Sequence, residues 1–168
     1  MTLNLPKPLL NLVLPLALPE NTDFLGKMLG KALLNDGSGG VIYLQGELGA
    51  GKTSLVRALL RSCGVEGRIK SPSYALLETY KVSSLYFYHL DFYRFKNPQE
   101  WQEAGFRDLF HLNAVVLIEW PEKAEDLLPQ PDLNIHLIYE GDTRIAELDA
   151  YTQRGVACIN YLNQSSKS

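Results

Sequence analysis

Cysteine is scarce in this 168-residue sequence, which holds only Cys63 and Cys158. The two residues lie far apart in the chain and form no spacing that is typical of a metal site or a redox pair. Disulfides are rare in cytosolic proteins, so two reduced thiols are the simplest interpretation. The sequence therefore gives no sign of a disulfide scaffold or of a cysteine-ligated metal.

Long hydrophobic runs are also missing. The leucine-rich segment up to Leu18 is interrupted by four prolines, Pro6, Pro8, Pro15 and Pro19. A membrane-spanning helix needs about 20 consecutive apolar residues, and a signal peptide needs an unbroken apolar stretch before its cleavage site. We therefore expect a cytoplasmic protein with no signal peptide and no membrane span.

An excess of charge of one sign is absent as well, because 16 basic and 19 acidic residues give a net charge of −3. This mild acidity argues against a general nucleic-acid coat protein. Residues 52–70 are locally basic, with one acidic residue against five basic ones: Lys52, Arg57, Arg61, Arg68 and Lys70. The segment is as typical of a solvated helix face as of a surface that contacts RNA or a protein partner.

The composition is otherwise ordinary, since 46% of the residues are hydrophobic and the length is that of one domain. We expect a single domain over residues 1–162, followed by a disordered polar tail over 163–168. No internal repeat is visible in the sequence, which argues against an array of repeated units.

A glycine-rich segment carries the strongest functional signal. It fits the phosphate-loop pattern G-x-x-x-x-G-K-[ST] at every fixed position, with Gly46, Glu47, Leu48, Gly49, Ala50, Gly51, Lys52 and Thr53. In such a loop, successive backbone N–H groups turn toward phosphate oxygens at the N-terminus of a helix. We expect Lys52 to reach the β- and γ-phosphates and the hydroxyl of Thr53 to ligate Mg²⁺. The pattern predicts binding of a nucleoside triphosphate together with Mg²⁺.

The residues on either side have the pattern that this loop requires. Residues 41–44 are apolar or β-branched and follow the breaker at 36–40, which predicts a buried strand. After Lys52, apolar residues at i, i+1, i+4 and i+5 predict a helix that Gly64 ends. A glycine-rich turn without a ligand is the alternative, and the strand-loop-helix order disfavours it.

The rest of the chain alternates predicted strands and helices. Strands are predicted at 11–18, 75–82, 85–90, 114–118, 132–139 and 144–151. Helices are predicted at 23–34 with Asn21 or Thr22 as the cap, in two short pieces around Gly105, at 121–128 and at 155–162. This order predicts an α/β fold of the P-loop NTPase type, with three layers and a mostly parallel mixed sheet flanked by helices.

Two acidic residues stand at the ends of predicted strands. Glu119 directly follows the apolar run 114–118, so a buried strand would deliver its carboxylate to the edge of the sheet where ligands of α/β folds bind. A phosphate loop needs such an acid to hold the metal or its water, although an exposed acid at a strand end is the alternative. Asp91 ends another apolar strand and is a candidate to orient the attacking water or to complete the outer shell of the metal.

Further polar residues surround Asp91. His89 and Tyr93 alternate with it, so the three side chains share one face of a strand. A lone histidine at such a position is more typical of a satisfied core residue than of a ligand. Arg94 is a candidate to neutralise phosphate charge, but an arginine at a strand end is also a common ion-pair partner.

Five segments together resemble the bacterial TsaE (YjeE) family of ATPases, which are required for the threonylcarbamoyladenosine modification of tRNA. They are GELGAGKTS at 46–54, KSPSY at 70–74, YHLDFYRF at 88–95, EAGFRDLF at 103–110 and VVLIEWPEKA at 115–124. The segments occur in family order, and the resemblance covers nearly the whole chain. The phosphate loop alone is unspecific, whereas the five segments together are highly specific.

The resemblance implies an ATPase that joins the TsaB and TsaD proteins and uses ATP hydrolysis to reset their complex between rounds of tRNA modification. Contact with tRNA would be indirect, through that complex, and the cofactors would be ATP and Mg²⁺. The phosphate-binding loop would extend to Ser54, and Lys52, Asp91 and Glu119 would be catalytic. Thr53 and Glu119 would hold Mg²⁺. A direct and a water-mediated contact of Glu119 both stay open, because the usual residue at such a position is Asp.

The resemblance also implies two segments that respond to the nucleotide. The first would be a switch formed by Ser71, Pro72, Ser73 and Tyr74, and Trp120 would lie in the second. Ser73 stands where the family usually has Thr, which keeps the hydroxyl. We therefore expect this departure to leave nucleotide binding intact.

Recognition of the base has the weakest support. The resemblance places the adenine near Thr22 and near the turn at Thr143 and Arg144, but no motif marks these residues. A helix cap and a surface turn are equally consistent with them. The sequence contains no Asn-Lys-x-Asp motif, which makes GTP a less favoured ligand than ATP.

Two other functions remain open from the sequence. A small-molecule or nucleotide kinase would need an acceptor pocket and a mobile lid that carries arginine. A nucleotide-gated assembly module would need ATP binding but not hydrolysis. The chain shows no large lid, no acceptor domain and no evident arginine finger, which favours an ATPase that is slow alone and stimulated by its partners.

Overall fold

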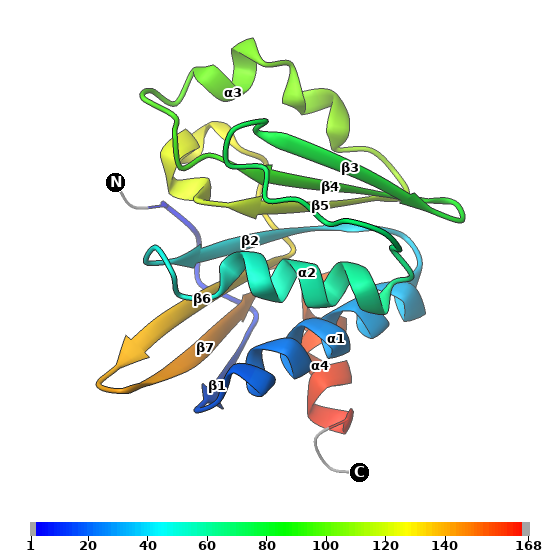
Figure 1. Ribbon diagram of the computed structural model, residues 1–168, viewed down its shortest axis with the longest axis vertical. Coiled ribbons are helices and arrows are strands. Elements are labelled where there is room, and N and C mark those ends of the chain that lie inside the picture. Colours follow the sequence, from blue (N-terminus) through cyan, green and yellow to red (C-terminus); the bar gives the residue numbers. More distant parts are fainter. Residues whose placement is uncertain (1–2, 166–168) are drawn as a thin grey trace.

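The computed structural model describes residues 3–165 and contains one seven-stranded sheet (Figure 1). The strands are β1 (Leu10–Leu16), β2 (Gly40–Gly46), β3 (Leu77–Val82), β4 (Leu85–Asp91), β5 (Ala114–Glu119), β6 (Leu133–Glu140) and β7 (Thr143–Ala150). Their order across the sheet is β1-β7-β6-β2-β5-β4-β3. The four central strands are parallel neighbours, and both edges are antiparallel. Five of the seven strands point the same way, which confirms the predicted mostly parallel mixed sheet.

Helices cover both faces of the sheet and complete the predicted three layers. One face carries α1 (Pro19–Asp36), α2 (Lys52–Ser62) and α4 (Gln153–Ser165), packed on a mainly aliphatic core. The other carries α3 (Glu100–Glu103) and the 3-10 helices η1 (Phe106–Leu109) and η2 (Pro121–Leu127) over an aromatic core. All six residues of β5 are buried, as expected for a parallel strand that is covered on both faces.

Two glycines let α1 approach α2 closely. A Cβ atom at Gly26 would lie 2.6 Å from the carbonyl oxygen of Leu55, and one at Gly30 would lie 1.8 Å from Oγ of Ser62. Neither position has space for a side chain. This packing holds the helix that begins at Lys52, so the glycines of α1 help to place the end of the phosphate loop.

The start of α1 and the end of α4 differ from the predicted boundaries. Helix α1 begins at Pro19, because proline at the first helical position has the required φ and no N–H to lose. The N-cap residue is Leu18, so neither Asn21 nor Thr22 has the predicted role, and Thr22 is buried near the start of the helix. Asn21 still contributes to the cap, because its Oδ1 accepts a hydrogen bond from the N–H of Leu18. Helix α4 extends through Ser165, so the first part of the predicted tail is helical, while 166–168 lie outside the described residues.

Residues 121–127 form 3-10 turns, where a regular helix was predicted. The run is interrupted at Glu125, whose φ of 51° and ψ of −137° lie outside any helical region. Gly105, with φ of 75°, separates α3 from η1, which confirms the two short pieces expected there. Within residues 3–165, no helix has the length and apolar character needed to cross a membrane.

Both cysteines are buried free thiols, as their spacing predicted. Burial raises the pKa of each, Cys63 and Cys158, to about 11. Because the thiolate is the reactive form, neither residue is suited to chemistry at neutral pH.

The sheet brings three strand ends to one edge. Strand β2 ends at Gly46, β4 at Asp91 and β5 at Glu119, and the three strands are parallel neighbours. Asp91 lies opposite Glu119 in the register of β4 and β5. The carboxyl edge of the central sheet therefore holds the start of the phosphate loop and both predicted acidic residues.

Candidate functional site

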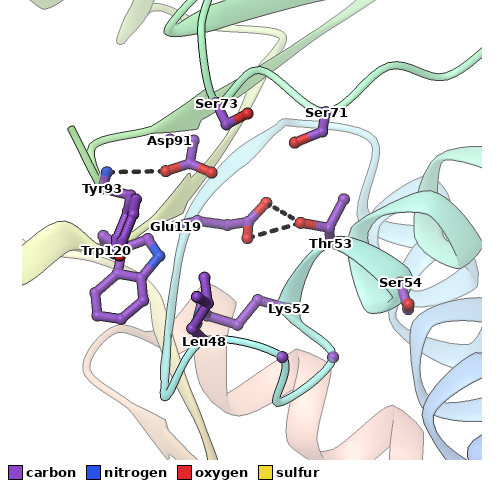
Figure 2. A pocket seen from close by; sticks show the side chains of 12 residues that line it. Leu48, Lys52, Thr53, Ser54, Ser71, Ser73, Asp91, Tyr93, Glu119 and Trp120 are labelled. Carbon is purple, nitrogen blue, oxygen red and sulfur yellow. Dashed lines mark hydrogen bonds between the residues drawn. The ribbon is translucent and has the colours of Figure 1, made fainter.

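A pocket opens at this edge of the sheet, beside the N-terminus of α2 (Figure 2). Four segments line it: the loop and first turn at 48, 49 and 51–54, the two serines at 71 and 73, residues 91 and 93 at and after the end of β4, and residues 119 and 120 at and after the end of β5. Most of the predicted site residues therefore meet in one place. Eight predicted residues do not line the pocket: Gly46, Glu47 and Ala50 of the loop, Pro72 and Tyr74 of the first switch, and Thr22, Thr143 and Arg144.

Left-handed glycines shape the loop between β2 and α2. Gly49 has φ of 83° and Gly51 has φ of 109°, a region that residues with a Cβ rarely adopt. At Gly51 a Cβ would also lie 2.6 Å from Nη1 of Arg144. The loop closes through a hydrogen bond of 3.0 Å from the N–H of Ala50 to the carbonyl of Glu47. Backbone conformation thus favours glycine at Gly51, a fixed position of the pattern, and at Gly49, one of its variable positions, and at Gly51 space requires it as well.

Lys52 is folded across the inside of the loop. Its ammonium donates hydrogen bonds to the carbonyls of Gly46 and Glu47, the latter at 3.0 Å, and lies 4.1 Å from the centroid of the Trp120 ring. Burial lowers the pKa of this ammonium, while the carboxylates of Glu119 and other neighbours oppose the shift. The side chain is a buried cation at the position where a phosphate loop binds its anion.

Thr53 and Glu119 form the second contact of the pocket. The hydroxyl of Thr53 lies 2.9 Å from Oε1 and 3.0 Å from Oε2 of Glu119, and Figure 2 shows the two side chains pointing toward each other. Hydroxyl and carboxylate oxygens are hard ligands of the kind that Mg²⁺ prefers. Within residues 3–165, no three side chains of His, Cys, Asp or Glu are grouped to hold a metal by themselves. This pair fits an ion that takes its remaining ligands from phosphate and water.

Asp91 lies next to this pair and is 5% exposed. Its Oδ1 accepts a hydrogen bond of 2.9 Å from the backbone N–H of Tyr93. Burial raises the pKa of Asp91, the charge of Glu119 adds to the shift, and the hydrogen bond from Tyr93 opposes it. A buried carboxylate with one oxygen held by the backbone and the other facing a pocket is suited to orient a water molecule.

His89 has a role that its pattern did not reveal. It is fully buried, as expected of a core histidine, but its Nε2 lies 2.6 Å from Oε2 of Glu119. The alternation of His89 and Asp91 placed both side chains on one face of β4. The contact with Glu119 depends on β4 and β5 being parallel neighbours in this register, which the sequence does not state.

The predicted first switch is only partly in the pocket. Ser71 and Ser73 line it, while Tyr74 is 82% exposed and its ring lies 4.0 Å from the guanidinium carbon of Arg94. Trp120 does line the pocket and has a left-handed φ of 58°. Its ring packs against that of Tyr93 at 5.1 Å between centroids.

Arg144 and Thr22 meet behind the loop. The guanidinium of Arg144 donates to the hydroxyl of Thr22 at 2.8 Å and to the carbonyl of Ala50. Tyr139, which sequence analysis did not single out, donates its hydroxyl hydrogen to the carbonyl of Gly49 at 2.9 Å. Thr143 is exposed at the start of β7 and does not line the pocket. In this arrangement Thr22 and Arg144 hold the loop from outside the pocket.

The chain matches known proteins over most of its length. Residues 16–148 match the family of threonylcarbamoyl adenosine biosynthesis protein TsaE. The tRNA threonylcarbamoyladenosine biosynthesis protein TsaE of Haemophilus influenzae is 43% identical over 120 residues, which are 71% of this chain and 76% of that protein. The protein of the same name in Bacillus subtilis is 33% identical over 124 residues, 74% of this chain and 75% of that protein.

A solved structure shows the same fold. The crystal structure of Bacillus subtilis YdiB superposes with a TM-score of 0.74 at 25% sequence identity and covers 93% of this chain and 97% of that one. The P-loop NTPase-like α/β architecture is therefore shared along nearly the full length of both chains. With the family match over residues 16–148 and the two relatives of the same name, the chain belongs to the TsaE family of tRNA threonylcarbamoyladenosine biosynthesis.

Proposed function

We propose that this chain binds Mg-ATP in the pocket of Figure 2 and hydrolyses it. In this proposal, hydrolysis resets a complex of TsaB and TsaD between rounds of tRNA modification. The observation that carries the proposal is the meeting of Lys52, Thr53 and Glu119 in one pocket at a phosphate loop. Membership in the TsaE family supports the pathway, and the loop supports the ligand class.

Each group has a separate task in this proposal. The loop N–H groups and Lys52 bind the phosphates, and the buried position of Lys52 strengthens its attraction to an anion. Thr53 and Glu119 hold Mg²⁺, either directly or through its waters. Asp91 orients the attacking water, since its carboxylate faces the same pocket. The bound ion would offset the charge that develops on the phosphate oxygens.

The small number of basic side chains in the pocket supports slow hydrolysis by the chain alone. Among the described residues that line the pocket, Lys52 is the only basic one. An arginine that a partner protein inserts is worth about 10³–10⁵ in the rate of many phosphate-loop enzymes. Arg94, the arginine closest to Asp91 in sequence, stacks on Tyr74. We therefore assign the missing cation to a partner. Among the described residues no arginine lines the pocket, which disfavours the kinase alternative.

Steady-state ATP hydrolysis with Mg²⁺ tests the proposal. The purified chain is measured alone and after addition of the matching TsaB and TsaD proteins, with Lys52→Ala as the blank. We expect a low rate alone, strong stimulation by the partners and no hydrolysis by the variant. A rate that the partners leave unchanged would contradict the partner-dependent role. Stoichiometric phosphate transfer to a hydroxyl acceptor would favour a kinase.

A second experiment tests whether hydrolysis is needed at all. Glu119→Gln keeps the size of the side chain but removes the charge that would hold Mg²⁺. We expect this variant to support no repeated rounds of tRNA modification while the chain still assembles with its partners. Repeated modification at the wild-type rate would instead favour an assembly module in which hydrolysis is incidental.

A further inference from the structure

The carboxylate of Glu119 is held from two sides. The hydroxyl of Thr53 reaches both of its oxygens from the side of α2, at 2.9 and 3.0 Å. On β4, Nε2 of His89 reaches Oε2 alone, at 2.6 Å. The two contacts differ in kind, because Thr53 is itself a candidate ligand of Mg²⁺, whereas His89 is fully buried and does not line the pocket.

The chemistry of the pair determines which atom donates. A carboxylate oxygen can only accept, so the proton of this hydrogen bond belongs to Nε2 of His89. Among the described residues, Nδ1 of His89 is buried and has no hydrogen-bond partner. Nε2 is therefore the one atom of the ring that has a hydrogen-bond partner. The imidazole has one directed interaction, and Glu119 receives it.

The burial of Glu119 makes its carboxylate depend on the hydrogen bond from His89. Glu119 is 2% exposed, so water does not solvate its carboxylate in place of a lost partner. The imidazole is carried by a central parallel strand whose backbone is paired on both sides. A short charge-assisted bond from such a rigid position fixes the rotation of the carboxylate, because His89 engages only one of its two oxygens. Oε1 is then left for the pocket.

From this geometry we infer that His89 is a positioning residue for Mg²⁺. It binds Oε2 of Glu119 and thereby presents Oε1, together with Oγ1 of Thr53, to the ion. His89 touches neither the ion nor the nucleotide. This inference rests on the proposed Mg-ATP site. Hydrogen-bond partners of metal-ligating carboxylates commonly contribute 10–100-fold to metal affinity, and we expect a loss on this scale when the Nε2 donor is removed.

Two amide substitutions separate the donor from the rest of the side chain. His89→Gln places its amide nitrogen near the position of Nε2, while His89→Asn places the same group near Nδ1, short of Glu119. The readout is binding of Mn²⁺ by paramagnetic resonance, with a non-hydrolysable ATP analogue present. We expect His89→Gln to bind Mn²⁺ within a few-fold of wild type and His89→Asn to bind it roughly 10–100-fold more weakly.

Affinity for the analogue in EDTA shows whether the effect is specific for the ion. We expect both variants to bind the metal-free analogue as wild type does, because the loop and Lys52 are untouched. Equal Mn²⁺ affinity in His89→Asn and wild type would overturn the inference. An equal loss of analogue affinity with and without the ion would also overturn it, since His89 would then serve the fold. Failure of wild type to bind Mn²⁺ with the analogue would overturn the proposed function itself.

A matched control histidine contacts the same strand from the loop before β5. His111 accepts or donates one hydrogen bond of 3.0 Å with the hydroxyl of Tyr88 on β4, away from the pocket. His111→Asn is expected to leave Mn²⁺ affinity unchanged.

A measurement on the wild-type protein tests the inference even if His89→Asn does not fold. We expect the ring N–H signal of His89 in the proton NMR spectrum to shift when Mg²⁺ joins the bound analogue, and a signal that does not move would overturn the inference.

Discussion

The ammonium of Lys52 lies 4.1 Å from the centroid of the Trp120 ring, and both side chains line the same pocket. The negative face of an indole attracts a cation by about 0.5–2 kcal/mol. Phosphate oxygens compete for that cation far more strongly, because they carry full charge. The environment of Trp120 is therefore coupled to whatever anion Lys52 binds.

Tryptophan fluorescence is expected to report the binding of ATP. The chain has two tryptophans, and Trp101 is fully buried in the aromatic core on the other face of the sheet from α2. Addition of Mg-ATP should change the emission of wild type and of Trp101→Phe, and leave that of Trp120→Phe unaltered. A change that persists in Trp120→Phe would show that Lys52 does not signal to this ring.

Lys52→Ala is expected to weaken ATP binding by about 10- to 100-fold, because a hydrogen bond to a charged group is worth about 1.5–3 kcal/mol. Isothermal titration calorimetry measures the change directly. Lys31→Ala is the matched control, since Lys31 is an exposed lysine on α1. Wild-type affinity in Lys52→Ala would contradict the assignment of the phosphate site.

Asp91→Asn is expected to stabilise the protein and slow ATP hydrolysis while leaving ATP affinity unchanged. Burial raises the pKa of Asp91 in the folded state, so the charged form opposes folding at pH values above that pKa. The penalty disappears as the pH falls through the folded pKa, because the wild-type side chain is then neutral as well. Thermal unfolding of the metal-free protein should show a higher Tm for the variant at pH 7.5 and a smaller difference at pH 5.

Equal losses of ATP affinity and hydrolysis in Asp91→Asn would assign this residue to binding and not to the orientation of water. A lower Tm at pH 7.5 would show that the hydrogen bond from Tyr93 outweighs the burial of the charge. The asparagine oxygen can accept the same hydrogen bond, so the substitution tests the charge alone.

Gly26→Ala is expected to lower the free energy of unfolding by about 1–3 kcal/mol, the usual cost of overpacking a closely packed contact. The added Cβ would lie 2.6 Å from the carbonyl oxygen of Leu55 and force α2 away from α1. Chemical denaturation measures the loss, and Lys27→Ala on the exposed face of the same helix should change stability by less than about 0.5 kcal/mol. An unchanged free energy for Gly26→Ala would show that the helices can separate without cost.

Much of the fold could be predicted because its signals are local. The strand at 41–44, the glycine-rich loop and the helix after Lys52 are consecutive in the chain, and each has a periodicity or a backbone requirement of its own. The start of α1 was misplaced because Asn21 and Thr22 are typical N-cap residues, while in the structure Pro19 occupies the first helical position. The segment at 121–127 was assigned a regular helix because the interruption at Glu125 has no sequence signal.

The candidate site likewise contains residues that local patterns predict and residues that they do not. Its loop residues and the acids at 91 and 119 follow from motifs and strand ends, and the structure brings them into one pocket. The support behind the loop does not follow from any pattern. Arg144 and Thr22 are separated by 122 positions and meet only because the turn after β6 lies beside the first turn of α1.

The sequence by itself determined the family, the phosphate loop and the alternation of strands and helices, because each is written in residues that are close together in the chain. The tertiary structure alone decided which distant side chains share a hydrogen bond. The contact between His89 and Glu119 exists because β4 and β5 pair in parallel with Asp91 opposite Glu119. Pairing and register are set by packing of the whole sheet, and a change of one residue in register would turn His89 to the opposite face.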